Sequence, residues 1–149
     1  MTDKLKKHAY LIMIHEDSEI LHKSLQLIDD KRNDIFIHID AKTNSTFKEQ
    51  LYQYILKSNL YFIENPIKVY WGHYSIVAAE YLLFEQAIQT GNYKYYHLLS
   101  GNDMPIKSQD FIHSFFDKNE GKEFIGFSNK YFRENIECIH LRPKYFRGG

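Results

Sequence analysis

The segment HLLSGNDMPIK, residues 97–107, follows an apolar run and then becomes abruptly polar. Its Asn102-Asp103 pair fits three kinds of chemistry. The acid could help hold a divalent cation, contact a substrate hydroxyl directly, or close a turn without any ligand. Gly101 stands where the first acid of an Asp-x-Asp metal motif would be, and a hard cation usually takes more oxygen ligands than one carboxylate supplies. The residues alone favour a turn and leave the other two readings open.

A second group of polar residues follows two earlier apolar runs. His15 and Glu16 come after the first run, and His38 and Asp40 lie at the end of the second. His38 and Asp40 are two residues apart, so their side chains leave a strand on the same face. Asp40 is the better candidate for a ligand contact, because it ends the strand and could accept hydrogen bonds from a uracil ring or a ribose hydroxyl. Capping the next turn explains this acid equally well.

A metal-dependent hydrolase is the alternative that the histidines raise. His15, His38, Asp40, His97 and Asp103 could surround a metal ion that activates water. However, no HExxH or comparable ligand spacing occurs, and His97 lies inside an apolar run, where a histidine is more often part of the core. A nucleophile elbow, a Gly-rich phosphate loop and a Rossmann fingerprint are also missing. We therefore expect no metal site.

The elements that must position these residues alternate along the chain. Apolar runs predict strands over 9–14, 34–40, 60–63, 94–99 and 123–127. Helical periodicity predicts helices after Asp17 or Ser18 (with Ile20, Leu21, Leu25 and Ile28 on one face), over 47–56, over 75–89 and from Ser108 to about Phe116. On the 75–89 helix, we expect a buried face of Val77, Tyr81, Phe84 and Ile88.

This alternation predicts an α/β fold, with a mostly parallel sheet flanked by helices, as one domain over 1–149. Continuous rather than alternating apolar runs are typical of strands buried on both faces. A sheet of this kind binds ligands at the carboxyl ends of its strands. The polar residues that follow the strands are therefore the candidate site.

The composition narrows the class of partner. Nineteen basic residues balance nineteen acidic ones, so no overall field attracts nucleic acid, and none is expected as a partner. Cys138 is the single cysteine, which excludes an internal disulfide and a cysteine zinc cluster. The apolar stretch 9–14 is too short to span a membrane, and no signal-peptide pattern follows it. We expect a cytoplasmic protein.

Four segments, taken together and in order, resemble the Core-2/I-branching enzymes, the β-1,6-N-acetylglucosaminyltransferases of glycosyltransferase family 14. The segments are YLIMIHEDSEILHKSLQLID, IFIHIDAK, VYWGHYSIVAAEYLLFEQAI and YYHLLSGNDMPIKS. Together the W-G-x-x-S and L-S-G-x-D-x-P-x-K patterns are fairly specific, although either one alone would be weak. The resemblance covers most of residues 9–125.

The resemblance implies a GT-A-like fold that binds a UDP-sugar, commonly UDP-N-acetylglucosamine, and inverts the anomeric centre without a divalent ion. No cofactor is expected. By position, Asp40 corresponds to the acid that contacts uridine, and Tyr70, next to Trp71, corresponds to an aromatic residue near the base. Ile14 and His15 would line the same pocket.

The resemblance also bears on the sugar and the acceptor. Asp103, with Asn102, would lie beside the donor sugar or the acceptor entrance, and Arg142 could touch the acceptor or a phosphate. The family's catalytic glutamate and its diphosphate-binding cations lie in a C-terminal half beyond residue 149. Glu123, Glu134 and Glu137 match no base motif, so the catalytic base is not assigned. The fold is expected to be the N-terminal, nucleotide-sugar-binding part of a GT-A-like domain, incomplete at its C-terminus.

The resulting hypothesis is an inverting, metal-independent bacterial glycosyltransferase. It would move a sugar, N-acetylglucosamine by resemblance, from a UDP-sugar to a glycan or glycolipid acceptor in surface polysaccharide or lipooligosaccharide synthesis. A glycolipid acceptor would allow peripheral association with a membrane, and the oligomeric state is left open. The alternative is a non-catalytic, truncated domain that binds a nucleotide or a partner chain.

Overall fold

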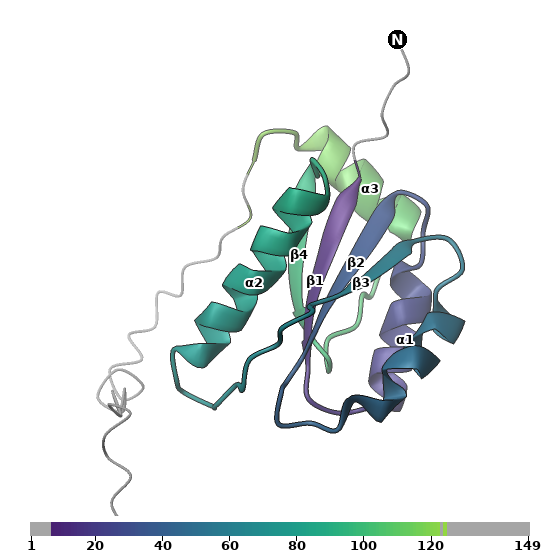
Figure 1. Cartoon of the computed structure of the whole chain (residues 1–149). Coiled ribbons are helices and arrows are strands. Elements are labelled where there is room, and N and C mark those ends of the chain that lie inside the picture. The colour runs from purple at the N-terminus through teal and green to yellow at the C-terminus, as the bar shows by residue number, and fades with distance from the viewer. Residues whose placement is uncertain (1–6, 123, 125–149) are drawn as a thin grey trace, which may run out of the picture.

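The structure is a computed structural model that describes residues 7–122 and residue 124. Its elements follow the predicted alternation of strands and helices (Figure 1). In chain order they are β1 (His8–Ile14), α1 (Glu19–Ile28), β2 (Asn33–Ile39), the 3-10 helix η1 (Ser45–Tyr54), β3 (Asn59–Phe62), α2 (Ser75–Thr90), β4 (Tyr95–Ser100) and α3 (Gln109–Lys118). The strand predicted over 123–127 lies outside the described residues, apart from Phe124.

The four strands form a parallel sheet in the order β3-β2-β1-β4. All carboxyl ends therefore lie at one edge of the sheet, the lower edge in Figure 1, which we call the carboxyl edge. The opposite end is the amino edge. At the carboxyl edge, Met13 pairs with His38 on one side and with Ser100 on the other. The predicted α/β class with a parallel sheet is confirmed.

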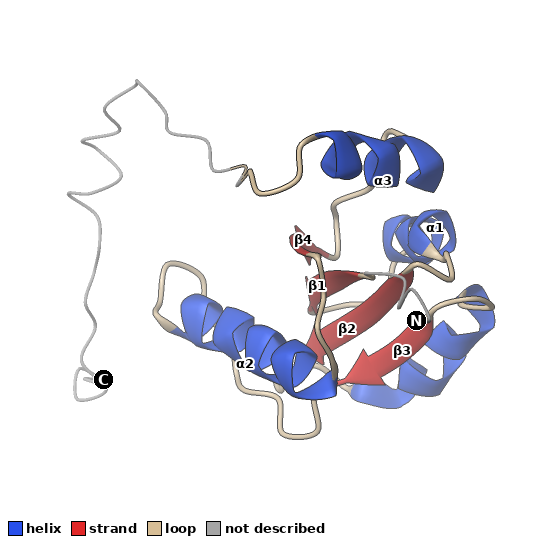
Figure 2. Ribbon diagram, turned by 90° about the horizontal axis from the view of Figure 1, so that it is seen from above, coloured by secondary structure: helices blue, strands red, loops and turns tan. Residues whose placement is uncertain are grey.

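Helices cover both faces of the sheet (Figure 2). On one face, Ile12 and Ile37 pack with Leu25 of α1 and Leu51 of η1, and α3 lies on this side too. On the other face, Leu11 packs with Leu83 of α2. Fully burying such side chains contributes about 1.5–3 kcal/mol each, so the strands have a fixed position. Whatever follows their carboxyl ends is held on a rigid base.

The predicted buried face of α2 is wrong for three of its four residues. Val77, Tyr81 and Ile88 are 40%, 64% and 63% exposed. Phe84, the fourth, is partly buried and packs against the core. The buried positions are Ser75, Ala79, Leu83 and Ala87, which recur every fourth residue. The small side chains of Ser75, Ala79 and Ala87 let the helix backbone approach the sheet closely, whereas a face with Tyr81 would hold it away. An apolar stripe of larger side chains is consequently left on the outer side of α2.

Two further details correct the sequence reading. The segment predicted as a helix over 47–56 is the 3-10 helix η1, and it begins two residues earlier. Ile20, which we expected on the buried face of α1, is 47% exposed, while Leu21, Leu25 and Ile28 are buried. The predicted caps are confirmed, because Ser18 and Ser108 each accept a hydrogen bond from a backbone amide of the following helix.

Buried polar groups at the amino edge form a packed cluster. His97 Nε2 lies 3.0 Å from His8 Nδ1, and the His97 ring stacks on Tyr10 with centroids 4.6 Å apart. The His113 ring is 4.0 Å from that of His8, and His113 Nε2 is 2.9 Å from Asn33 Oδ1. His97 is partly buried and packs against the buried members of this cluster, as expected for a histidine inside a strand.

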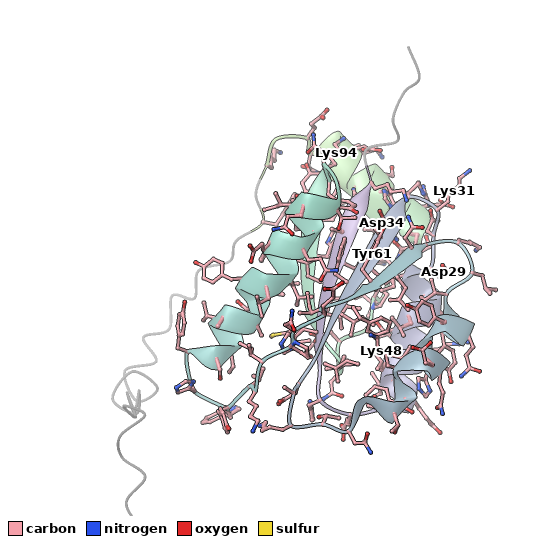
Figure 3. The ribbon with its side chains drawn as sticks, viewed as in Figure 1. Asp29, Lys31, Asp34, Lys48, Tyr61 and Lys94 are labelled. Atoms are coloured by element: carbon pink, nitrogen blue, oxygen red, sulfur yellow. The ribbon has the colours of Figure 1, made fainter. Side chains whose placement is uncertain are left out.

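The same edge holds a buried acid. Asp34, 5% exposed, accepts hydrogen bonds from Lys7 Nζ, Asn59 Nδ2 and Tyr93 Oη at 2.7, 2.9 and 2.7 Å. Figure 3 shows Asp34 beside Tyr61 on the sheet, with Lys94 toward the same end of the strands. Burial, helped by the Asp34 carboxylate, raises the pKa of Tyr93 above its usual range. These contacts join β2, β3 and the segment before β4.

Candidate functional site

A cavity of about 400 Å³ opens at the carboxyl edge, on the α2 side. It collects residues from β1, β2, β4, the loop before α2 and α2 itself. Its lining consists of Met13, Ile14, His15, His38, Asp40, Lys42, Val69, Trp71, Ile76 and Ser100. Four of the five predicted donor-binding residues, Ile14, His15, Asp40 and Trp71, are therefore brought together in one cavity. We call it the edge cavity.

Asp40 ties together the loops that surround the edge cavity. It is 6% exposed, and its Oδ1 accepts hydrogen bonds from the backbone amides of Lys42 at 2.9 Å and Val69 at 3.3 Å. Its Oδ2 lies 3.3 Å from Lys42 Nζ. The turn-capping explanation of this acid is thus correct. It is compatible with a ligand contact, because each carboxylate oxygen can accept more than one hydrogen bond.

The fifth predicted donor residue, Tyr70, lies beside the cavity rather than in its lining. Lys42 Nζ stands 4.6 Å from the centre of the Tyr70 ring, within the range of a cation–π contact. The Tyr70 amide donates to Ser75 Oγ at 2.8 Å, which anchors the segment to the start of α2. Asp40, Lys42 and Tyr70 therefore form one connected rim.

A tight turn presents Trp71 to the cavity. The His73 amide donates to the Tyr70 carbonyl at 3.2 Å, and Gly72 has a φ of +67°. Residues with a Cβ rarely adopt this left-handed conformation, which explains a glycine after the tryptophan. Trp71 is 98% exposed, so its ring is free to stack on a ligand.

The end of β1 and the loop after it contribute one buried and one exposed residue to the edge cavity. Ile14 is 2% exposed and forms part of the cavity wall. The side chain of His15 is 63% exposed, with Nε2 3.7 Å from Glu16 Oε1. The backbone of His15 is fixed, because its carbonyl accepts a hydrogen bond from Thr43 Oγ1 at 2.6 Å. His15 can therefore change its side-chain conformation without moving the loop.

Residues 100–103 form a self-contained turn. The Ser100 amide donates to Asp103 Oδ2 at 2.6 Å, and the Asp103 amide donates to the Ser100 carbonyl at 3.1 Å. Ser100 Oγ accepts from the Asn102 amide at 3.3 Å. The turn reading of this segment is correct. Asn102 and Asp103 are exposed next to Ser100, but neither is part of the cavity lining.

Gly101 occupies a tightly packed position. A Cβ at this position would lie 3.1 Å from Ile14 Cγ2, closer than most real Cβ contacts. An aspartate here, as in an Asp-x-Asp motif, would require Ile14, a wall residue of the edge cavity, to shift by a few tenths of an ångström. The absence of a first acid therefore agrees with the packing of β4 against the end of β1.

The ligand set of the hydrolase hypothesis is not assembled. His97 belongs to the amino-edge cluster, whereas His38 and Asp40 lie at the carboxyl edge. Within residues 7–122 and 124, no three side chains of His, Cys, Asp or Glu lie close enough together to hold a metal ion.

A second cavity, of about 470 Å³, lies next to the first and shares Asp40 with it. Thr43, Lys48, Glu64 and Asn65 are among its polar lining residues. Lys48 comes from η1, in the lower part of Figure 3, and its Nζ stands 4.8 Å from the centre of the Phe62 ring. Asp40 thus separates two hollows at the carboxyl ends of β2 and β3.

Sequence reasoning missed several residues of the edge cavity. His38 was noted on the same face as Asp40 but was not chosen as a ligand group, and Lys42, Val69 and Ser100 were not chosen either. Lys42 could have been found, because it follows the strand end by three residues. Val69 contacts Asp40 from 29 residues away, and no local pattern reveals such a contact. Arg142, the remaining predicted contact, lies outside the described residues.

Known proteins match this chain over most of its length. The family model described as "Core-2/I-Branching enzyme" matches residues 8–143. A human beta-1,3-galactosyl-O-glycosyl-glycoprotein beta-1,6-N-acetylglucosaminyltransferase 3 is 30% identical over 102 residues, which are 67% of this chain and 23% of the human protein. Two further N-acetylglucosaminyltransferases, from bovine herpesvirus 4 and from Bos taurus, are each 28% identical over 102 residues. These residues are again 67% of this chain and 23% of the relative.

The chain thus spans about a quarter of the length of these relatives. Among the described residues, no helix is long and apolar enough to cross a membrane. The strand order, the cavity at the carboxyl edge and the family match over residues 8–143 agree with one another. This chain belongs to the Core-2/I-branching enzyme family.

Proposed function

We propose that this chain forms the donor-nucleotide-binding part of a glycosyltransferase that uses a UDP-sugar, with N-acetylglucosamine as the sugar. The observation that carries the proposal is the edge cavity, which gathers Ile14, His15, Asp40 and Trp71 at the carboxyl ends of parallel strands. Ligands of open α/β sheets bind at this place. The names of the similar enzymes support the choice of sugar.

Each lining residue has a definite role in this proposal. The Asp40 carboxylate accepts a hydrogen bond from the nucleoside, and the exposed Trp71 ring covers one of its faces. Ile14 supplies the apolar wall on which the nucleoside rests. Lys42, 43% exposed at its side chain, is the cation nearest to Asp40 and can turn toward the diphosphate. It would offset negative charge that builds up on the leaving group.

The reaction proposed is an inverting transfer. The acceptor hydroxyl attacks the anomeric carbon while a general base takes its proton, and the bond from that carbon to the UDP oxygen breaks with its electron pair leaving on the diphosphate. None of the residues 7–122 and 124 is assigned as that base. The acceptor is proposed to be a glycan or glycolipid.

We further propose that binding of the donor needs no divalent ion. Two features of the carboxyl edge support this. Gly101 replaces the first acid of a metal motif, and the Cβ of an acid there would lie only 3.1 Å from Ile14 Cγ2. The Asp103 carboxylate is also already engaged by the Ser100 amide.

Calorimetry and thermal unfolding with UDP test the proposal. UDP at a hundredfold excess over its Kd should stabilise the chain by about 2.7 kcal/mol, raising its Tm by several degrees. The same rise is expected in EDTA. Asp40→Ala should weaken binding about tenfold or more, while Glu49→Ala, which removes an exposed acid of η1, should not. No detectable UDP binding by the unsubstituted chain would refute the proposal.

A second candidate function is a non-catalytic domain that binds a partner chain. The apolar stripe of Val77, Tyr81 and Ile88 on the outer side of α2 favours it, because exposed apolar stripes often mark interfaces. Analytical ultracentrifugation separates the two candidates. If the chain associates as its concentration rises, and Tyr81→Ser abolishes this association, the partner-binding candidate is supported. If the chain is a monomer at all concentrations, the partner is not a second copy of this chain.

A further inference from the structure

The apolar stripe on the outer side of α2 is longer than Val77, Tyr81 and Ile88 alone. Tyr74, 68% exposed, extends it at the start of the helix, and the partly buried Phe84 lies between Tyr81 and Ile88. The five positions recur at spacings of three, four, three and four residues. This is the spacing of the a and d positions of a heptad, which line the side of a helix that packs against another helix. The stripe therefore has the pattern of a helix-docking surface.

Acidic side chains border the stripe on both sides. Glu80 and Glu85 are the charged residues of α2, and they lie on opposite flanks of the stripe. Among the described residues neither has a cationic partner, and Glu85 accepts one long hydrogen bond, of 3.4 Å, from Gln89 Nε2. A second copy that packed its own α2 here would place acids against acids, which is unfavourable at flanking positions. The surface therefore fits a helix with basic flanks.

This chain contains a segment of that composition. Residues 125–149 lie outside the described residues, and their sequence holds five Lys and Arg against two Glu, although the whole chain is balanced. Within them, Phe132, Ile136 and Ile139 recur at spacings of four and three, which is the pattern of one apolar helical face. Pro143 follows at the point where such a helix would end.

The charges of this segment also match the flanks of the stripe. Arranged as a helix, the segment places Arg133 on one side of its apolar face and Arg142 on the other. Glu134 and Glu137 fall on the opposite, outward side. The apolar face therefore has a basic group on each flank, as the acidic flanks of α2 require.

The described chain ends close to the stripe. The ring of Phe124 is 5.2 Å from that of Phe116 in α3, which is 4.4 Å from that of Tyr95 at the start of β4. The next residue of β4, Tyr96, lies on the other face, with its ring 5.6 Å from that of Phe84 in the stripe. Since β4 is an edge strand, with α2 and α3 on opposite sides of the sheet (Figure 2), the chain need only pass around one free edge.

The lengths agree with this path. Residues 125–129, when extended, span about 17 Å, which is more than the spacing of about 10 Å between packed layers. A helix over residues 130–142 would be about 20 Å long, and the stripe from Tyr74 to Ile88 extends over about 21 Å. The segment can therefore reach the stripe and cover it.

We propose that residues 130–142 dock as an amphipathic helix on the apolar stripe of α2 in the same chain. Phe132, Ile136 and Ile139 would contact the stripe, with the two arginines beside Glu80 and Glu85. Arg142, which the resemblance relates to the acceptor or a phosphate, would then belong to this helix contact instead. The inference goes beyond donor binding, and it names the occupant of the surface on which the second candidate function relies.

Cys138, the single cysteine of the sequence, allows a direct test. On the proposed helix it points away from the apolar face, so a nitroxide label there leaves that face intact. In the ¹⁵N-labelled full chain, we expect the amide NMR signals of residues 77–88 to lose most of their intensity, relative to the sample with the nitroxide reduced. The signals of α1, which packs on the other face of the sheet, should keep theirs. Full intensity along α2 would overturn the proposal.

Charge reversal tests the recognition of the segment. Glu80→Lys combined with Glu85→Lys should restore most of the α2 signals, because it sets cations against the basic flanks of the segment. The matched control is Glu19→Lys combined with Glu49→Lys, which changes the charge equally at exposed positions of α1 and η1 and should leave the signal loss as it was. An undiminished signal loss in the Glu80 and Glu85 variant would contradict the proposed recognition.

A mixed sample distinguishes the chain's own segment from that of a second copy. The ¹⁵N-labelled Cys138→Ser variant is mixed with spin-labelled chain that carries no ¹⁵N, and its α2 signals should stay intact. A loss of α2 signals in this mixture would assign the stripe to a second copy and overturn docking within one chain. None of these measurements involves UDP, so their failure and the failure of the proposed function are distinguishable.

Discussion

His38 at the carboxyl edge and His8 and His97 at the amino edge are histidines of the same sheet, but their surroundings differ. His97 is paired with His8, and its ring stacks on Tyr10. Among the described residues, Nε2 of His8 has no hydrogen-bond partner, and the rings of His113 and Tyr95 lie 4.0 and 5.3 Å from that of His8. His38 instead lines a cavity. The amino-edge histidines therefore belong to a packed cluster, whereas His38 belongs to the wall of a cavity.

The two edges should respond differently to perturbation. At the amino edge, polar groups bond mainly to one another, so their loss should reduce stability. At the carboxyl edge, the polar groups hold loops around an open cavity, so moderate substitutions should reduce binding more than stability. The predictions that follow test this division, beginning with the largest expected effect.

The amino-edge histidines should make the fold sensitive to acid. Burial lowers the pKa of His8 to about 3 and that of His97 to about 4, from 6.5 in the unfolded chain. Below pH 6.5 the unfolded chain takes up protons that the folded chain does not, so stability falls as the pH falls. From pH 7 to 5 the loss is about 2 kcal/mol for each histidine, or about 4 kcal/mol together. Urea unfolding at both pH values measures it.

A matched variant identifies the groups responsible for that loss. His97→Phe keeps an aromatic ring in the cluster but cannot be protonated. The loss between pH 7 and 5 should shrink by about 2 kcal/mol in this variant. Equal stability of the unsubstituted chain at the two pH values would show that the cluster is protonated in the folded state.

Asp34→Ala should cost about 3 kcal/mol of stability. It removes the acceptor for Tyr93 Oη, which is left unpaired in a buried place, and the acceptor for Nδ2 of the exposed Asn59. The ion pair with Lys7 adds little, because that side chain is 29% exposed. Urea unfolding gives the loss, and the folded variant should bind UDP as before. Asp40→Asn is the contrasting variant, with a stability loss under about 1 kcal/mol and weaker UDP binding.

The sequence alone predicted the sheet well, because continuous apolar runs such as residues 9–14 must be buried on both faces. It did not predict which side of α2 faces the sheet. Two stripes of α2 qualify, and the choice depends on how close the backbone can approach, which Ala79 and Ala87 decide. Apolar side-chain area alone ranks Tyr81 above alanine and therefore selects the wrong stripe.

The candidate site was predictable only in part, for a related reason. Asp40 follows a strand end, and this local feature is visible in the sequence. The role of His38 depends on the Ile67 amide, 29 residues away in a loop without a regular pattern. Only the folded chain shows that Nε2 of His38 accepts a hydrogen bond from that amide. His38 and His97 look alike in the sequence, since each lies in an apolar strand.

Gly101→Ala should have a smaller effect, and the effect should appear at the carboxyl edge. The new Cβ would lie 3.1 Å from Ile14 Cγ2, so Ile14 must shift by a few tenths of an ångström. We expect a stability loss of about 1 kcal/mol and UDP binding weakened about fivefold, measured by unfolding and calorimetry. Gly91→Ala is the control, because its nearest atoms, in the Tyr93 ring, are 3.7 Å away. Equal UDP affinity in the two variants would show that Ile14 does not contribute to UDP binding.

The smallest effect is expected for His15→Ala. Its side chain is 63% exposed, so stability should change by less than about 0.5 kcal/mol. The loop should stay in place, because Thr43 holds it through the backbone carbonyl of residue 15. A two- to threefold loss of UDP affinity in calorimetry would then report a direct contact of the imidazole. Glu16→Ala is the control that separates a direct contact from an effect of charge. If Glu16→Ala changes the UDP affinity as much as His15→Ala does, His15 acts only through the local electric field. His15 would then not be a donor-binding residue.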